Sequence, residues 1–554
     1  MLRWLSSLTD SSPLGSVANA RKFVTSLDRD IFSAADEVSE LLRSFIADAD
    51  DPAKVAGQMS PLLALQQAFS ESSARLERDY LAASQQTHSL QGRLWDSGYE
   101  LAMRFADAHR VVLSTLKAAP TPKSQAHYAQ SAVSYFDFRA MAYRYRLYRH
   151  EEWVPNNWRE LHDVFRKLCD FGLDHIAVTF ENQQQATYPA HAFVAVLLLR
   201  LGNAGGYMPS QTHTLAQKLR EASFDARLTA RPAADGGFAV DLSGADGLVT
   251  RHSVPQGGQF LFCDTSAIYS RMMGWLSAVD AQPIEGAPTQ GAASGNPILA
   301  LRSAVLRIDP EFKPLARASQ RNTDQGRVIA VFGMYRSSGV LAYKPKVLTA
   351  SLGGENYGYA DAQEIQTLGV LKDSTIQRLK QDLPPEAIKL KPQYWHLRDR
   401  SDTGFRCVLP HTEDSSVRLR DIAVVSEEEP SMGWQVAMVV RLLKLPANQI
   451  ELGLQVLTRD AAPLELRTLR TRPGMYRDND PTIAASAIFK GIRLKGAFFG
   501  RPLMDMSWII STSDFNAGLI YEMSGSARRY EARTVIAEGS DWIWVQPNEL
   551  VREK

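Results

Sequence analysis

With 554 residues, the chain is too long for a single hydrophobic core, so roughly two to four domains are expected. The 62 lysines and arginines are balanced by 61 acidic residues, and a formal net charge of +1 argues against a general nucleic-acid or membrane-surface role. The three cysteines, Cys169, Cys263 and Cys407, are far apart, which excludes a disulfide framework and indicates a reducing compartment.

Neither the N-terminus nor the longest apolar run predicts a membrane anchor. Residues Met1–Ser7 contain no continuous apolar stretch followed by a small-residue cleavage site. The apolar run Ala192–Leu199 is ended by Arg200 and is too short to cross a bilayer. We therefore expect a cytoplasmic protein without a transmembrane segment.

Residues 1–225 are predicted to form an all-α helical bundle or solenoid. Apolar residues recur at helical spacing from Ile31 to Phe45, with Ser26 or Asp28 available as an N-cap. No repeat of fixed period is present. Helical arrays often bind partner proteins, so by fold analogy we expect a protein partner here. Prolines mark the expected helix boundaries, at Pro52, Pro61, Pro120, Pro122, Pro155 and Pro189.

Between Tyr135 and His150, arginines alternate with tyrosines and phenylalanines. Such a segment can stack on bases or bind phosphates. Alternatively, it is a helix that buries its aromatic rings while the guanidiniums reach solvent or acidic neighbours such as Glu151 and Glu152. We favour the second interpretation. The nearby histidines and cysteine fit no standard zinc spacing, so neither a metal site nor a cofactor is predicted.

The helical pattern of the sequence gives way to short strand-like segments after residue 225. Residues 226–280 are predicted to be a small α/β attachment, with strands near Phe238–Leu242 and Gln259–Asp264. Residues 281–297 are rich in Pro, Gly, Ala, Ser and Gln and form the clearest linker in the chain.

The remainder is predicted to be β-rich, which makes the whole chain a multidomain α+β protein. Residues 298–469 form the expected antiparallel barrel, with an insertion at about 335–392. Residues 470–554 form a smaller β-rich unit, with strands expected at Thr482–Phe489, Ser507–Ser511, Gly518–Glu522 and Trp542–Gln546.

A strand ending in Tyr394–Leu397 leads directly into Asp399-x-Ser401-x-x-Gly404. Further expected strands follow at Phe405–Pro410, Trp434–Leu442 and Glu451–Leu457. An Arg-x-x-x-Arg pair, Arg317 and Arg321, stands just before the expected strand Arg327–Gly333. The same spacing also occurs at Arg227/Arg231 and Arg529/Arg533, so the arginine spacing alone carries no weight.

This order of arginine pair, strand, Asp-x-Ser-x-x-Gly and barrel strands resembles the PilZ family, the bacterial cyclic-di-GMP receptor module. The resemblance implies a ligand with two phosphates and two guanines. Arg317 and Arg321 are then expected to wrap the ligand, because a guanidinium pairs bidentately with phosphate or with guanine O6 and N7.

On the same resemblance, Asp399 accepts from guanine N1–H and N2–H, and Ser401 adds a flexible hydrogen bond. Gly404 leaves room for the base. Arg398 and Arg400 flank the motif and are reserve candidates for a phosphate contact.

The pattern departs from the family in one respect: Arg321 and Asp399 are 399 − 321 = 78 positions apart, whereas the two motifs are usually separated by little more than a strand. A barrel accommodates an insertion whose ends lie close together. The alternative is that Asp399–Gly404 is a capped turn in a degenerate barrel that serves as a scaffold and binds no nucleotide.

No nucleophile elbow, P-loop, dinucleotide fingerprint, zincin or kinase motif is present, so a binding protein is predicted and not an enzyme. The prediction is a bacterial signalling protein whose barrel binds cyclic-di-GMP and whose helical part contacts a protein partner, with no DNA or RNA ligand. By resemblance, the output is motility, surface attachment, biofilm formation or polysaccharide production. The sequence leaves the oligomeric state open.

Overall fold

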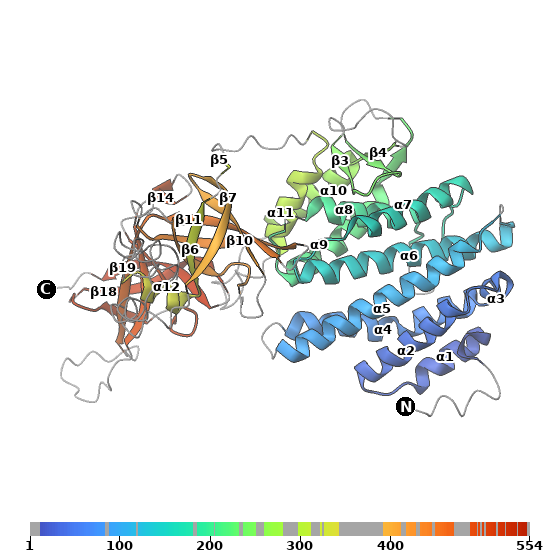
Figure 1. Ribbon diagram of the computed structural model, residues 1–554, viewed down its shortest axis with the longest axis horizontal. Helices are drawn as coiled ribbons and strands as arrows, with labels where there is room; N and C mark the ends of the chain where they lie inside the picture. Colours follow the sequence, from blue (N-terminus) through green and yellow to red (C-terminus); the bar gives the residue numbers. More distant parts are fainter. Residues whose placement is uncertain are drawn as a thin grey trace, which may run out of the picture. The chain divides into compact units, whose positions relative to one another are not determined.

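The computed structural model divides the chain into two units, Met1–Ala287 with Gly295–Pro314, and Pro288–Ser294 with Leu315–Lys554. The first is mainly helical and the second is built from β-strands (Figure 1). The structure describes all residues except 1–11, 84–87, 118–119, 181–184, 204, 232–236, 251–259, 281–296, 312–321, 324–325, 343–391, 411–416, 428–432, 446–448, 470–487, 496, 499–500, 503–505, 517–518, 527, 540 and 551–554.

The predicted helical N-terminal region is confirmed. Its helices are α1 (Val17–Ser26), α2 (Ile31–Ala47), α3 (Pro52–Gly57), α4 (Met59–Ala82), α5 (His88–Ser114), α6 (Pro122–Tyr148), α7 (Pro155–Asp170), α8 (Pro189–Gly202) and α9 (Pro209–Ala222).

Proline begins five of these helices, because its fixed φ suits the first helical position and its missing N–H needs no partner there. Pro52, Pro122, Pro155 and Pro189 occupy that position, as the sequence predicts, whereas Pro61 lies within α4.

The N-cap of α2 differs from both predicted candidates. Asp30 caps this helix, because its carboxylate accepts a hydrogen bond from the backbone N–H of Ser33 at 3.0 Å. Neither Ser26 nor Asp28 lies close enough to the first turn in sequence to replace it, and Ser26 is the last residue of α1.

The helical unit also contains a small sheet with the strand order β1-β4-β2-β3. Its elements are β1 (Arg227–Thr229), β2 (Phe238–Asp241), β3 (Val249–Thr250), β4 (Phe260–Asp264), and the following helices α10 (Ser266–Asp280) and α11 (Pro297–Ile308). Residues 298–308 were expected to begin the barrel half, but α11 packs on α8, α9 and α10 instead. Its apolar face completes the core of the helical unit through Ala300, Ala304, Val305 and Ile308.

The first barrel closes six strands in the order β7-β6-β9-β10-β11-β8, with β8 returning to pair with β7. The strands are β6 (Arg327–Phe332), β7 (Gln393–Ser401), β8 (Gly404–Pro410), β9 (Ile422–Glu427), β10 (Gln435–Leu445) and β11 (Gln449–Thr458). The short strand β5 (Asn322–Thr323) pairs with the C-terminal part of β7, whereas β6 pairs with its N-terminal part. The helix α12 (Met334–Val340) begins the expected insertion, and most of the rest of that insertion lies outside the described residues.

The C-terminal β-rich region is a second closed barrel, with the order β12-β13-β16-β19-β18-β17. Its strands are β12 (Asp460–Leu469), β13 (Ile488–Lys495), β16 (Ser507–Ser511), β17 (Ile520–Met523), β18 (Arg529–Glu538) and β19 (Trp542–Leu550), and the ribbon β14 (Ala497–Phe498) with β15 (Arg501–Pro502) stands apart. Strand β12 belongs to this barrel, so the second barrel starts before residue 470.

The two barrels share an apolar core. One buried cluster combines Ile422, Val436 and Leu457 of the first barrel with Ile492, Ile509, Trp542 and Trp544 of the second. The helix α12 bridges them, because Ser338 donates a hydrogen bond of 2.7 Å to the carbonyl of Gly491. The barrels are therefore joined into a single unit.

Candidate functional site

The Asp-x-Ser-x-x-Gly motif lies on the β7–β8 hairpin of the first barrel. Asp399 lies near the end of β7, Ser401 is its last residue, and Gly404 is the first residue of β8. A register shift between Leu397 and Asp399 places Arg398 at a β-bulge. Bulges re-aim side chains at functional edges of barrels, so the motif occupies a position suited to presenting polar groups.

Strand β5 brings a distant segment of the chain beside this motif. Asn322 pairs with Arg400 and Thr323 pairs with Asp399. The residue that directly precedes Asn322 in the sequence is Arg321. Arg317 and Arg321 themselves lie outside the described residues, but the chain that follows them runs along Asp399 in spite of the long intervening insertion.

A row across four neighbouring strands holds three charged residues next to the motif. Asp399 on β7 pairs with Arg406 on β8, which pairs with Gly453 on β11, which in turn pairs with Arg441 on β10. Gly453 leaves space between the arginines, since a Cβ there would lie 3.0 Å from the Cβ of Arg441. The row thus places two guanidiniums and a carboxylate on one face of the barrel.

Glu451 receives both guanidiniums of this row. Arg406 Nη2 donates to Glu451 Oε2 at 2.6 Å, and Arg441 Nη1 lies 3.9 Å from Glu451 Oε1. The other nitrogen of Arg406, Nη1, is 3.6 Å from Asp399 Oδ2. The hydrogen bond that Arg406 donates to Glu451 raises the pKa of Arg406, with further contributions from the charges of Glu451 and Asp399. The carboxylate of Asp399 is therefore placed beside a fixed positive charge.

The remaining motif residues have mainly local contacts. Ser401 Oγ lies 3.4 Å from both Thr403 Oγ1 and the carbonyl of Gly404. Arg400 forms an ion pair with Glu427 of β9. Arg398 is exposed. The guanidinium of Arg398 is therefore an accessible group at this edge, and Ser401 is partly exposed.

The packing of the barrel strands explains the glycine at position 404, apart from any need to leave space for a ligand. A Cβ at this position would lie 2.3 Å from the carbonyl oxygen of Leu454 on β11. Barrel closure therefore requires glycine here whether or not a base binds.

Arg406, Glu451 and Arg441 were not among the residues predicted for the site. Their strands were predicted, and residues two apart on a strand share a face. Which strands become neighbours was not predicted, so the convergence on Glu451 was missed.

The arginine–tyrosine segment of α6 is explained by packing. Tyr135, Tyr143 and Tyr145 are completely buried. The guanidiniums of Arg146 and Arg149 lie 3.3 Å and 3.6 Å from carboxylates. The interpretation as a packed helix is confirmed in preference to a base-stacking surface.

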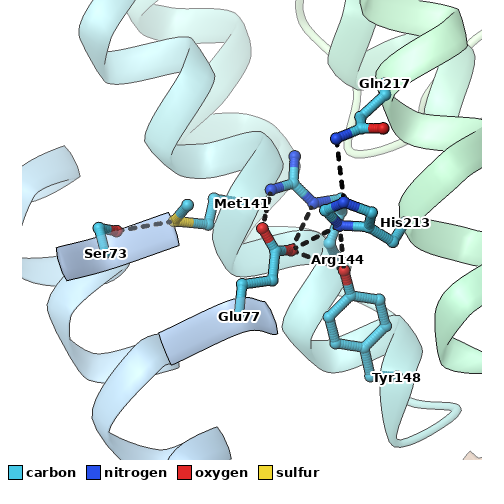
Figure 2. Close-up of polar contacts among 7 residues, drawn as sticks. All are labelled: Ser73, Glu77, Met141, Arg144, Tyr148, His213 and Gln217. Carbon is cyan, nitrogen blue, oxygen red and sulfur yellow. Dashed lines mark hydrogen bonds and ion pairs between the residues drawn. The ribbon is translucent and has the colours of Figure 1, made fainter. Parts of the chain in front are cut away.

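A buried charge pair joins the same helix α6 to α4 (Figure 2). Arg144 of α6 donates bidentately to Glu77 of α4 at 2.9 and 3.0 Å, and Tyr148 donates to the same carboxylate at 2.6 Å. His213 of α9 lies 3.4 Å from Glu77 and bonds Gln217. Glu77 is only 4% exposed, and its oxygens point toward these partners. Since the partners come from α6 and α9, the cluster joins these two helices to α4.

No group of three or more histidine, cysteine or acidic side chains in the described part of the chain has the arrangement of a metal site. Among the described helices, none combines the length and apolar content needed to cross a bilayer.

The chain therefore consists of a helical N-terminal unit and two joined β-barrels. The first barrel carries the Asp-x-Ser-x-x-Gly motif on a hairpin. Comparison with known families concerns the helical part: residues 2–233 match the family described as cyclic-di-GMP receptor FimW, N-terminal domain. No curated protein and no solved structure matches the chain significantly.

Proposed function

We propose that the chain is a cytoplasmic, non-enzymatic signalling protein that binds cyclic-di-GMP on its first barrel. The observation that carries this proposal is the pairing of β5 with Asp399 and Arg400. It brings the segment after Arg317 and Arg321 to the Asp399–Gly404 hairpin, which the long separation in sequence had put in doubt.

Two independent parts of the chain support the same ligand. The barrel motif resembles the PilZ module, and the helical segment matches the N-terminal domain of a protein described as a cyclic-di-GMP receptor. The match does not extend to the barrel strands, so neither argument depends on the other.

The chemistry of the site is suited to such a ligand. Asp399 supplies acceptors for the guanine N1–H and N2–H groups, and guanidiniums at Arg317 and Arg321 supply bidentate donors for phosphate or for guanine O6 and N7. Arg398 is an exposed additional donor for a phosphate. Arg317 and Arg321 then contact the ligand together with the hairpin, and binding changes how the helical unit is presented to a protein partner.

Titration calorimetry of the full chain with cyclic-di-GMP tests this proposal. We expect binding heat for the wild type and a loss of about tenfold or more in affinity for Arg321→Ala and for Asp399→Ala, because each removes charge-assisted hydrogen bonds. Arg231→Ala is the matched control, since Arg227 and Arg231 share the spacing but lie on another unit. Absence of heat with the wild type contradicts the receptor proposal and supports a scaffold with a degenerate barrel.

A further inference from the structure

The contacts of Arg406 extend the candidate site beyond the motif residues. Its guanidinium lies between two carboxylates, 2.6 Å from Glu451 and 3.6 Å from Asp399. The side chain of Glu451 is 5% exposed, whereas that of Arg406 is 41% exposed. Arg406 is thus held from the barrel side by a buried anchor while one edge of its guanidinium faces Asp399.

This arrangement restricts what the carboxylate of Asp399 can do. A free aspartate rotates about two side-chain bonds, but a guanidinium fork fixed nearby favours the rotamers that keep one oxygen beside it. Without Arg406, the negative charge of Glu451 would face Asp399 unshielded, and like charges at short range repel. Arg406 therefore both attracts Asp399 and screens it from Glu451.

We infer that Arg406, anchored by Glu451, is a positioning residue that orients Asp399 to accept the N1–H and 2-amino groups of a guanine. It thereby sets the preference of the site for guanine over bases that lack the 2-amino donor. This inference rests on the proposed function, because it assigns a role within the same cyclic-di-GMP site.

A direct contact of Arg406 with a phosphate is the competing role. The two roles differ in what they do to selectivity. A phosphate contact strengthens binding of every cyclic dinucleotide equally, whereas orientation of Asp399 strengthens ligands that offer both N1–H and the 2-amino group more than ligands that offer N1–H alone. The ratio of two affinities separates the roles where a single affinity does not.

The experiment compares cyclic-di-GMP with cyclic-di-IMP, whose hypoxanthine bases lack the 2-amino groups, by calorimetry on the full chain. We expect the wild type to prefer cyclic-di-GMP by about tenfold or more, the value of a lost hydrogen bond to a charged group. Arg406→Ala should weaken binding of cyclic-di-GMP by about tenfold or more and binding of cyclic-di-IMP by a smaller factor, so the preference for cyclic-di-GMP shrinks.

Three further variants separate positioning from a loss of folding. Arg406→Lys keeps the charge without the fork and should restore part of the preference. Glu451→Gln removes the charge that anchors Arg406. It should reduce the preference for cyclic-di-GMP although Arg406 and Asp399 themselves are unchanged. Arg528→Ala removes an exposed arginine that pairs with Glu549 on the second barrel and should leave the preference unchanged, which makes it the control for loss of a surface guanidinium.

The outcomes distinguish this inference from the proposed function. Suppose that the wild type binds cyclic-di-GMP, and that Arg406→Ala lowers the affinity for both ligands by the same factor or lowers neither affinity. The positioning role of Arg406 is then overturned, whereas the proposal of a cyclic-di-GMP receptor stands. The same holds if the wild type does not discriminate between the two ligands. If the wild type binds neither ligand, the proposed function fails first.

Discussion

A methyl group at position 404 has no space in the first barrel, because its Cβ would lie 2.3 Å from a carbonyl oxygen of the adjacent strand. Strands β8 and β11 pair directly at this point, with Gly404 opposite Gln455. The glycine of the motif is therefore explained by the closeness of the two backbones. A loss of ligand binding on its replacement is not, by itself, evidence of contact with the ligand.

Replacing Gly404 with Ala tests this residue-scale explanation. The backbone must shift to accommodate the Cβ, and we expect the free energy of unfolding to fall by about 1–3 kcal/mol. Chemical unfolding followed by circular dichroism measures the change. Gly433→Ala is the control: its Cβ would meet no atom within 4 Å, so we expect a change within about 0.5 kcal/mol. An equal effect in both variants contradicts the argument.

The junction of helices α4, α6 and α9 depends on one buried carboxylate. Burial alone would raise the pKa of Glu77, but the charge of Arg144, together with hydrogen bonds from His213 and Arg144, outweighs burial and holds this pKa well below its ordinary value of 4.5. A carboxylate with a lowered folded-state pKa stabilises the fold above its unfolded pKa and loses that contribution as the pH falls.

Glu77→Gln leaves the guanidinium of Arg144 buried without its counterion. We expect a loss of about 3–5 kcal/mol in the free energy of unfolding at neutral pH, since one partner of a buried pair remains unpaired. The difference from the wild type should narrow below about pH 4.5, where unfolding allows Glu77 to bind a proton. Urea unfolding at several pH values measures both effects.

Glu71→Gln supplies the control for this helix-scale prediction. Glu71 and Arg78 form an ion pair of 2.6 Å on the surface of the same helix α4, with side chains 81% and 57% exposed. Exposed pairs contribute little, so a change within about 0.5 kcal/mol is expected. A pH-independent difference for Glu77→Gln contradicts the assignment of its stability to the ionised carboxylate.

At the scale of the whole molecule, the two barrels share one apolar core. Trp542 of β19 is fully buried in the cluster that also contains Ile422 and Val436 of the first barrel. Its indole N–H donates a hydrogen bond of 2.7 Å to the carbonyl of Arg420, which precedes β9. Neither barrel can bury this surface alone, so we expect the barrels to unfold together.

Trp542→Ala tests this coupling. The cavity should cost about 3–5 kcal/mol, and hydrogen exchange should accelerate in β9 and β10 as well as in β16 and β19. Trp508→Ala is the comparison, because Trp508 packs with Leu464, Tyr521 and Tyr530 inside the second barrel only. Faster exchange limited to the second barrel in both variants contradicts a shared core.

The class of each region was predictable from sequence, because helical and strand periodicities are local properties. The sequence predicted α2, the proline helix starts, and strands such as Ser507–Ser511, and it located the Asp399–Gly404 motif before a barrel strand. It missed β9, a short apolar run that resembles any buried segment, and it assigned α11 to the wrong half.

The pairing of strands, in contrast, is visible only in the folded barrels. The pairing of β5 with β7 and the convergence of Arg406, Arg441 and Asp399 around Glu451 join residues from separate strands. These contacts arise from barrel closure, which depends on packing across the whole sheet and leaves no periodic trace in the sequence of any one strand. For the same physical reason, the motif was recognisable from sequence, but the charges around it were not.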